Sequence, residues 1–243
     1  MADMNGWMMI PDAFANTLFA TAGWTSVTLD MQHGLYDLAS VTATLQALPG
    51  QTPRRIVRVP WNDPGVLGKV LDASADGVII PMINSVDDAK AAADACWYPP
   101  KGSRSYGPAL AALRSGATPY LEAAKTIEVW AMIETREALA NVEAIAAVDG
   151  ITGLYVGPSD LGLALGLEPK YDRDEPEMLE AYQRILDAAA AHGKSTGIFC
   201  ASADYAARMA GRGFSLVTVI SDVFLLRGGA GATLSALNAS ISA

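Results

Sequence analysis

The sequence predicts an α/β protein of the (β/α)₈ class, a TIM barrel, and three observations lead to this prediction. Eight short apolar runs recur along the chain, and most are rich in Val and Ile. Segments with a helical pattern separate these runs, as in a parallel sheet whose crossovers are helices. The chain has 243 residues, and single barrels of this class commonly run to about 250 residues. We therefore expect a single domain spanning residues 1–243.

The predicted strands are short and apolar, as strands buried on both faces should be. They lie at Trp7–Ile10, Ser26–Asp30, Ile56–Val59, Val78–Pro81, Ile127–Ile133, Leu154–Val156, Thr196–Phe199 and Leu216–Ile220. An open, doubly wound sheet is the competing architecture. No G-x-G-x-x-G motif follows a strand in this sequence, which removes the commonest functional support for that alternative.

The predicted helices occupy the gaps between these strands. They lie at Asp12–Thr21, Asp37–Leu48, Pro64–Ala73, Val86–Ala95, Thr135–Ala147, Pro176–His192, Ala203–Arg212 and from Val223 through Arg227 onward. Asp12, Ser85 and Ser202 have the side chains that N-caps require. Gly193 and Gly211 are expected to end helices, because glycine adopts the left-handed conformation common at such ends.

Two segments fall outside this alternation. The stretch Trp97–Gly116 is the longest without a helical pattern, and a loop of that length in a compact domain is more often functional than accidental. A helical tail begins at about residue 222, and from Gly228 it is rich in Gly, Ala and Ser. We expect this tail either to fray or to pack on a neighbouring subunit.

Composition and charge argue against several classes of function. The net charge is −9 and the pI is ≈ 4.6, so no basic stripe is available for nucleic-acid phosphates. Apolar stretches are interrupted well before the roughly 18 residues of a membrane span, and the N-terminus lacks the pattern of a secretory signal. Cys96 and Cys200 lie far apart in apolar surroundings, which favours buried free thiols. The sequence predicts a cytoplasmic protein without a membrane or nucleic-acid partner.

Two carboxylates follow two successive predicted strands. Glu134 comes directly after the run at 127–133, and Asp160 follows Leu154–Val156 and a short turn. If the two strands are parallel neighbours, both acids leave the same end of the barrel. Two converging carboxylates with open coordination positions suit a hard divalent cation. Each acid has an alternative role at a helix N-terminus, where the macrodipole stabilises negative charge.

Three more polar residues lie at or near strand ends. Asp30 ends the second predicted strand, His33 follows shortly after it, and Arg58 lies within the third. A buried arginine is costly unless an anion meets it, so Arg58 either binds substrate or is the structural ion-pair partner of Asp30. The position of His33 favours proton transfer near neutral pH over a structural role. His192, at a predicted helix end, is interpreted as structural.

Six short motifs occur in order along the chain. They are DMQHG at 30–34, RVPW at 58–61, VIIPM at 78–82, YPPKGSRSYG at 98–107, IETR at 133–136 and GPSDL at 157–161. This set resembles the HpcH/HpaI family, from about Gly6 to about Arg227. Members are class II, metal-dependent pyruvate aldolases related to 2,4-dihydroxyhept-2-ene-1,7-dioate aldolase and hydroxy ketoacid aldolases. The resemblance implies a barrel of the phosphoenolpyruvate/pyruvate superfamily type.

The resemblance also implies roles for the residues that match the motifs. Glu134 and Asp160 would bind a divalent cation, Mg²⁺ or Mn²⁺, with Co²⁺, Ni²⁺ or Zn²⁺ as further options. Arg58 would contact the keto oxygen of a 2-oxoacid. His33 would move protons through water, and Asp72, which spacing alone gives no role, matches the acid paired with that histidine.

Further residues match the substrate-binding positions of the family. They are Gly157, Pro158, Ser159 and Asp160 in one turn, with backbone N–H groups for the substrate carboxylate, and Trp7 and Phe199 on the acceptor side. One position departs from the pattern: Met132 stands where some members carry a glutamine. A methionine cannot donate that hydrogen bond, so contacts near the metal or the substrate oxygens are expected to differ.

Residues and resemblance together predict a carbon–carbon lyase, an aldehyde-lyase. It would cleave a 4-hydroxy-2-oxoacid reversibly to pyruvate or hydroxypyruvate and an aldehyde, through an enolate stabilised by the metal and Arg58. Two alternatives stay open: an oxaloacetate decarboxylase-type reaction through the same enolate, and a non-catalytic barrel that binds a metal and a 2-oxoacid. By resemblance, the expected partners are small 2-oxoacids and aldehydes, and other copies of the chain in a homohexamer.

Overall fold

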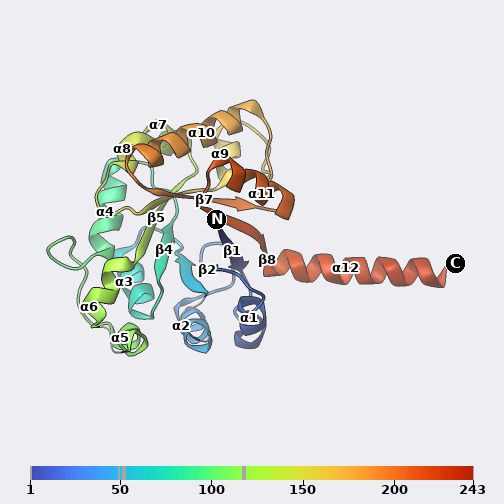
Figure 1. Cartoon of the computed structure of the whole chain (residues 1–243), viewed down its shortest axis with the longest axis horizontal. Coiled ribbons are helices and arrows are strands. Elements are labelled where there is room, and N and C mark those ends of the chain that lie inside the picture. Colours follow the sequence, from blue (N-terminus) through green and yellow to red (C-terminus); the bar gives the residue numbers. More distant parts are fainter. Residues whose placement is uncertain (1, 49, 51–52, 117–118, 243) are drawn as a thin grey trace.

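Eight parallel strands close into a barrel in the computed structural model, which describes residues 2–48, 50, 53–116 and 119–242 (Figure 1). The strands are β1 Asp3–Met8, β2 Ser26–Asp30, β3 Arg54–Arg58, β4 Gly77–Ile80, β5 Glu128–Ile133, β6 Gly153–Val156, β7 Ser195–Cys200 and β8 Leu216–Ser221. Each strand pairs with its neighbours in sequence, and β8 closes the barrel on β1. The predicted (β/α)₈ barrel is confirmed.

Helices connect the strands and lie outside the barrel. They are α1 Ala13–Ala20, α2 Leu38–Ala47, α3 Pro64–Asp72, α4 Val86–Cys96, α5 Ala109–Ser115, α6 Tyr120–Ala123, α7 Arg136–Ala140, α8 Val142–Ala146, α9 Pro158–Ala164, α10 Pro176–Ala191, α11 Ala203–Arg212 and α12 Asp222–Ile241, with a 3₁₀ turn at Ala124–Thr126. The predicted N-caps Asp12, Ser85 and Ser202 each accept a backbone N–H of the following turn. Gly211 was wrongly predicted as a stop, because α11 continues through Arg212 and is capped by Gly213, whose φ is +114°.

The first strand starts earlier than predicted, because a polar residue lies within it. Asn5 points into the barrel, where its Nδ2 donates to Ser26 Oγ at 2.9 Å. The hydroxyl groups of Thr28 and Thr218 each donate to Asn5 Oδ1 at 3.0 Å. A polar side chain is tolerated in a core when such partners satisfy it. Apolar runs in the sequence do not reveal such a polar network, so they place the start of the strand too late.

Short helices account for the other differences from prediction. The predicted helix at 135–147 is divided into α7 and α8 at Asn141, whose side chain donates to the Asn84 carbonyl at 2.8 Å. The stretch 97–116, predicted to lack a helix, contains α5, and the turn at 157–159 leads into α9. Both helices have 7 residues, too few to reveal a helical period in the sequence.

Apolar side chains fill both faces of the barrel wall. The interior cluster consists of Trp7, Ile56, Ile79, Trp130, Met132, Tyr155 and Leu216. A larger cluster lies between the strands and the surrounding helices. The barrel is therefore a packed core rather than a pore. Cys96 and Cys200 are buried without a disulfide, as predicted.

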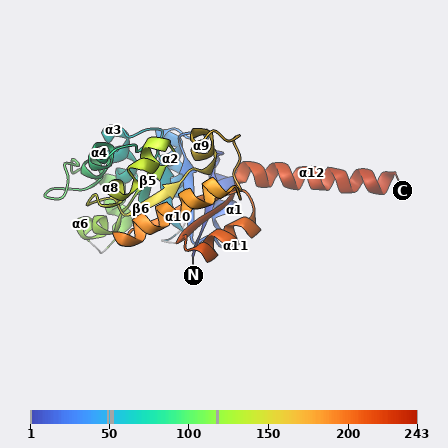
Figure 2. The same cartoon turned by 90° about the horizontal axis from the view of Figure 1, so that it is seen from above.

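The last helix, α12, extends away from the barrel (Figures 1 and 2). It is helical to Ile241 rather than frayed, and none of its described residues is buried. Its start is fastened to the barrel, because the Asp222 carboxylate accepts the N–H groups of Met9 and Ile10 at 2.9–3.0 Å. Nowhere in the described part of the chain is there a helix long and apolar enough to span a bilayer.

Candidate active site

A cavity of ≈ 400 Å³ lies at the carboxyl ends of the barrel strands. Most of the predicted site residues line it: Trp7, His33, Arg58, Gly157, Pro158, Ser159, Asp160 and Phe199. They reach it from strand ends and from the loops that follow the strands. In barrels of this class the active site lies at this end.

Arg58, the last residue of β3, forms a two-pronged ion pair with Asp30, the last residue of β2. The two residues are register partners, and Arg58 Nε and Nη2 donate to Asp30 Oδ1 and Oδ2 at 2.8 and 2.6 Å. Burial alone would raise the pKa of Asp30, but the hydrogen bonds and charge of Arg58 outweigh it and hold that pKa below its ordinary value. The predicted ion pair is therefore present. It leaves Arg58 with Nη1, which has no hydrogen bond to any described residue.

Glu134 follows β5 and is 2% exposed. Its Oε1 accepts the backbone N–H of Met82 at 2.8 Å, and Met82 has a φ of 57°, uncommon for a residue other than glycine. Burial and, to a lesser degree, the charge of Asp160 raise the pKa of Glu134 to about 7, although the Met82 N–H opposes this shift. Gly157 packs against the same carboxylate, since a Cβ at position 157 would lie 2.6 Å from Oε2.

Asp160 lies in the first turn of α9, directly after Pro158 and Ser159. It is exposed and lines the cavity. The backbone N–H of Leu161 begins the helical hydrogen-bond pattern, because it donates to the carbonyl of the N-cap residue Gly157 at 3.0 Å. The N–H groups of Ser159 and Asp160 precede it and have no acceptor within the helix, as is usual for a first turn.

The two carboxylates fit a hard divalent cation. Glu134 Oε2 has no hydrogen bond to a described residue, and the electrostatic repulsion between Glu134 and Asp160 is of the kind that a cation relieves. No group of three or more His, Cys, Asp or Glu suited to a metal occurs among the described residues. A cation here would thus have two protein carboxylates and keep its other positions for substrate and water.

Asp72 is the predicted residue that lies away from this cavity. It is the last residue of α3, and its Oδ1 accepts a hydrogen bond from Arg104 Nη2 at 2.6 Å. Helix α3 starts after β3 ends and returns toward the start of β4, so Asp72 lies near the opposite end of the barrel from His33. Within one chain the structure does not bring these two residues together, and their pairing stays a prediction.

A row of aromatic side chains forms one wall of the cavity. Ring centroids lie 5.5 Å apart for Trp7 and Phe199, 5.1 Å for Phe199 and Tyr171, and 5.8 Å for Tyr171 and Phe224. At one end of the row, the guanidinium carbon of Arg58 lies 4.8 Å from the centroid of Trp7. Sequence reasoning missed Tyr171 and Phe224, because they come from the loop after α9 and from the start of α12.

The floor of the cavity includes Met132 and Tyr155, which point inward from β5 and β6. Met132 is 2% exposed, and the Tyr155 hydroxyl shares a hydrogen bond with Thr218 at 2.6 Å. A tyrosine within a short apolar strand was the available signal for Tyr155. The Met82 N–H had no such signal, because it depends on the local backbone conformation.

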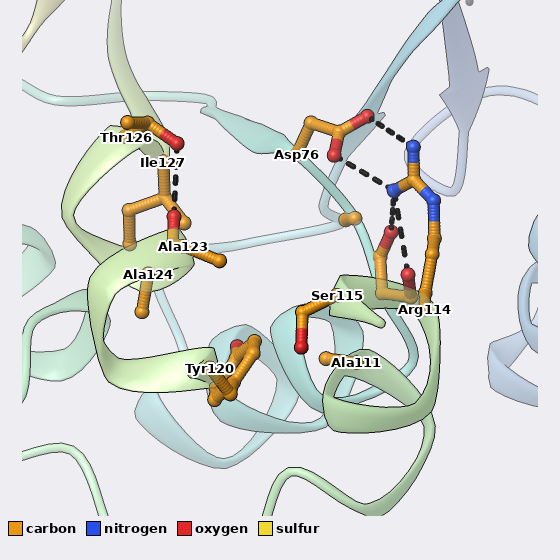
Figure 3. A pocket seen from close by; sticks show the side chains of 11 residues that line it. Asp76, Ala111, Arg114, Ser115, Tyr120, Ala123, Ala124, Thr126 and Ile127 are labelled. Carbon is orange, nitrogen blue, oxygen red and sulfur yellow. Dashed lines mark hydrogen bonds and ion pairs between the residues drawn. The ribbon is translucent and has the colours of Figure 1, made fainter. Parts of the chain in front are cut away.

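A second hollow, of ≈ 160 Å³, lies where β4 and β5 begin, at the opposite end of the barrel (Figure 3). Arg114 of α5 donates Nη1 and Nη2 to the two carboxylate oxygens of Asp76 at 2.7 and 3.2 Å. Arg114 Nη1 also donates to the carbonyl oxygen and the hydroxyl group of Ser74. None of the predicted site residues lines this hollow.

Comparison with known proteins assigns a family to this arrangement. Residues 10–228 match the family model for HpcH/HpaI aldolase/citrate lyase. The chain is 40% identical over 221 residues to the hydroxypyruvate/pyruvate aldolase of Rhizorhabdus wittichii, covering 91% of this chain and 88% of that protein. It is 35% identical over 227 residues to the 4-hydroxy-2-oxo-heptane-1,7-dioate aldolase of Salmonella dublin, covering 92% and 86%.

A solved structure agrees with these sequence matches. The HpcH/HpaI aldolase/citrate lyase family protein of Burkholderia cenocepacia aligns with a TM-score of 0.86 at 30% identity, covering 97% of this chain and 94% of that one. The aldolase names of the relatives and their coverage confirm the predicted carbon–carbon lyase. The chain belongs to the HpcH/HpaI aldolase/citrate lyase family.

Proposed function

We propose that this protein is a divalent-metal-dependent aldolase that cleaves 4-hydroxy-2-oxoacids to pyruvate or hydroxypyruvate and an aldehyde, and that catalyses the reverse addition. The observation that carries the proposal is the arrangement of three groups: Asp160 and the Arg58 guanidinium line one cavity, and the Glu134 carboxylate lies beside it, against Gly157. The name of the relative from R. wittichii supports pyruvate and hydroxypyruvate as the 2-oxoacids.

The addition reaction begins with loss of a proton from C3 of the 2-oxoacid, which leaves an enolate. C3 then forms a bond to the carbonyl carbon of the aldehyde, and the carbonyl electron pair moves to the aldehyde oxygen, which takes up a proton. Cleavage is the reverse sequence. A bound divalent cation supplies Lewis-acid stabilisation of the negative charge that develops on the 2-oxoacid.

Arg58 contributes a fixed positive charge beside the developing enolate. The Asp30 pair occupies Nε and Nη2, so the guanidinium plane is held while Nη1 stays available to the keto oxygen. A donor that is already oriented stabilises charge without reorganising during the reaction. In this proposal the substrate carboxylate is received by the N–H groups of Ser159 and Asp160 in the turn Gly157-Pro158-Ser159.

His33 is proposed to move the proton, through water, between the reacting atoms and solvent. It is exposed and lines the cavity, and an imidazole can both accept and donate a proton. If Asp72 orients this histidine, it does so as Asp72 of the partner subunit, because Asp72 of the same chain pairs with Arg104 near the other end of the barrel.

The remaining parts of the proposal concern the cation, the assembly and the location. Mg²⁺ and Mn²⁺ suit two carboxylates plus substrate oxygens best, and Co²⁺, Ni²⁺ or Zn²⁺ are substitutes. Exposed apolar side chains on α12 (Leu226, Leu234, Leu237 and Ile241) support its packing on another subunit, and we propose a homohexamer. We also propose a cytoplasmic location.

Chelation and metal replacement test the proposed function. Protein treated with EDTA should release no pyruvate from 4-hydroxy-2-oxopentanoate, and Mn²⁺ or Mg²⁺ should restore the release. Circular dichroism of the treated protein checks that the barrel stays folded. Full activity after chelation, or no release with metal present, would contradict the proposal.

A further inference from the structure

We infer that the preferred aldehyde of this enzyme is uncharged and apolar, and aromatic in the best case, rather than an aldehyde with its own carboxylate. The inference rests on the proposed aldolase function and concerns the half of the cavity away from Arg58. Two features carry it: the aromatic row Trp7, Phe199, Tyr171 and Phe224, and the distribution of charge around the cavity.

The aromatic row leads from the proposed reaction centre toward solvent. Trp7 is 2% exposed and lies beside Arg58, whereas Tyr171 and Phe224 are 39% and 38% exposed at the other end of the row. Successive rings meet at tilted or edge-to-face angles, the arrangement that aromatic groups prefer among themselves. An aldehyde that adds to the 2-oxoacid beside Arg58 can extend its substituent along this wall.

The two outer aromatic residues, Tyr171 and Phe224, leave apolar surface exposed that a substrate can cover. In the isolated chain, the residues Tyr171 and Phe224 each keep more than a third of their accessible surface in water while they line the cavity. An apolar substituent placed against them would remove part of this surface from water, which is favourable in proportion to the area covered. A ring on the aldehyde would add the edge and face contacts that the row already shows.

Charge around the cavity disfavours an aldehyde with a carboxylate. Arg58 is the one Arg or Lys among the described residues that line the cavity, and Asp30 already holds it. A carboxylate on the aldehyde would therefore lose water against aromatic rings without gaining an ion-pair partner, which is costly.

Lys170 does not remove this difficulty. It lies in a neighbouring hollow together with Asp172, and it does not line the cavity itself. Its side chain is exposed to solvent. A carboxylate that reached Lys170 would have to extend past the Tyr171 and Pro169 side chains, which border both spaces.

The relatives make the choice testable, because their names differ in this respect. The Salmonella dublin protein is named for a 1,7-dioate, a substrate with a carboxylate at each end, whereas the R. wittichii protein is named for its 2-oxoacids alone. The aromatic row predicts that this chain discriminates against substrates of the dioate kind.

Matched pairs of aldehydes test the inference in the wild-type protein with pyruvate and Mn²⁺. The pairs are benzaldehyde with 4-formylbenzoate, and butanal with 4-oxobutanoate; within each pair the members differ chiefly by one carboxylate. We expect kcat/KM for the uncharged member to be higher by on the order of 10-fold or more in each pair. We also expect benzaldehyde to exceed butanal. Equal or higher kcat/KM for the carboxylated members would overturn the inference.

Variants of Tyr171 test whether the aromatic row causes the preference between the paired aldehydes. Tyr171→Arg adds a cation to the row and should shift the ratio toward 4-formylbenzoate by about 10-fold, while Tyr171→Leu should lower kcat/KM for benzaldehyde more than for butanal. Phe14→Ala, on α1 and 73% exposed outside the cavity, is the matched control and should leave both ratios unchanged. Unchanged ratios in folded Tyr171→Arg, checked by thermal unfolding, would also overturn the inference.

Exchange of the methyl protons of pyruvate with D₂O distinguishes a failure of the proposed aldehyde preference from a failure of the proposed aldolase function, because exchange needs no aldehyde. Metal-dependent exchange without a preference between the aldehyde pairs would overturn the acceptor inference alone. No exchange in a metal-binding protein would overturn the aldolase function, and the acceptor inference with it.

Discussion

Both ends of this barrel contain an arginine–aspartate ion pair beside a cavity, yet the surroundings of the two pairs differ. At the carboxyl ends of the strands, Arg58 pairs with Asp30, the carboxylate is fully buried, and the cavity measures ≈ 400 Å³. At the opposite end, Arg114 pairs with Asp76 beside a hollow of ≈ 160 Å³, and the Asp76 side chain is 32% exposed (Figure 3).

The difference shows that an ion pair alone does not identify a catalytic end. Arg114 also donates to Ser74, and its contacts connect helix α5 to the residues just before β4. Arg58 instead has Nη1 available and faces the cavity to which Asp160 contributes a carboxylate, with Glu134 close by. At this end the positive donor lies near two acids that we propose as ligands of a cation, whereas the described lining of the hollow beside Arg114 contains one acid, Asp76.

The largest effect is expected from Glu134→Gln. The amide keeps the size of the side chain and an oxygen for the Met82 N–H but removes the charge that a cation requires. We predict a loss of kcat/KM on the order of 10³-fold, with much weaker Mn²⁺ binding in calorimetry. Near wild-type activity would show that Glu134 is not a ligand and would weaken the contrast between the two ends.

Arg58→Lys should have the next largest effect, about 10²-fold on kcat/KM. A single lysine ammonium group cannot donate hydrogen bonds to both carboxylate oxygens of Asp30 and also donate to the substrate. Mn²⁺ binding should change little, which separates this variant from the loss of a metal ligand. The matched change at the other end, Arg114→Lys, should leave kcat/KM close to wild type. Equal losses in the two variants would contradict the assigned difference.

Asp30→Asn tests how strongly the catalytic pair depends on charge. Removing one charge of a buried pair should lower the free energy of unfolding by about 2 kcal/mol at pH 7, measured by urea denaturation. The folded pKa of Asp30 lies below the unfolded value of about 3.9, so its stabilisation is complete above that pH. It is lost as pH falls through the folded pKa, and wild type and variant should then converge. A pH-independent difference would show that charge is not its cause.

The smallest effect is expected from Asp76→Asn at the opposite end. Because this pair is partly exposed, its loss should cost about 1 kcal/mol or less of unfolding free energy. The kcat/KM for aldol cleavage should stay within about twofold of wild type, since no proposed catalytic group contacts this carboxylate. A large loss of activity in the folded variant would mean that the two ends of the barrel are coupled.

Residues that end strands could be predicted from the sequence, because a barrel delivers all strand ends of one kind to the same mouth. Glu134, Asp160, Arg58 and His33 were found in this way, and the structure places the last three around the cavity with Glu134 beside it. The barrel itself followed from apolar runs and their spacing. The predicted bounds of strand β1 were displaced toward the C-terminus, because Asn5 interrupts the apolar pattern of the strand with a polar side chain that is hydrogen-bonded in the core.

Features that depend on tertiary contacts could not be predicted in this way. Tyr171 and Phe224 reach the cavity from a loop and from the start of the last helix, and neither position has a local signal. The Met82 N–H serves Glu134 through an uncommon backbone conformation that its sequence does not announce. The role of Asp72 came from resemblance alone, and within one chain its partner is Arg104.

The central claim is that Glu134, Asp160 and Arg58 together stabilise an enolate of a 2-oxoacid. Exchange of the methyl protons of pyruvate in D₂O, followed by NMR, tests it most directly, because no aldehyde takes part. We predict rapid exchange with Mn²⁺ or Mg²⁺, none after chelation, none in Glu134→Gln or Asp160→Asn, and wild-type exchange in Asp76→Asn. Absence of exchange in wild-type protein that binds the metal would contradict it.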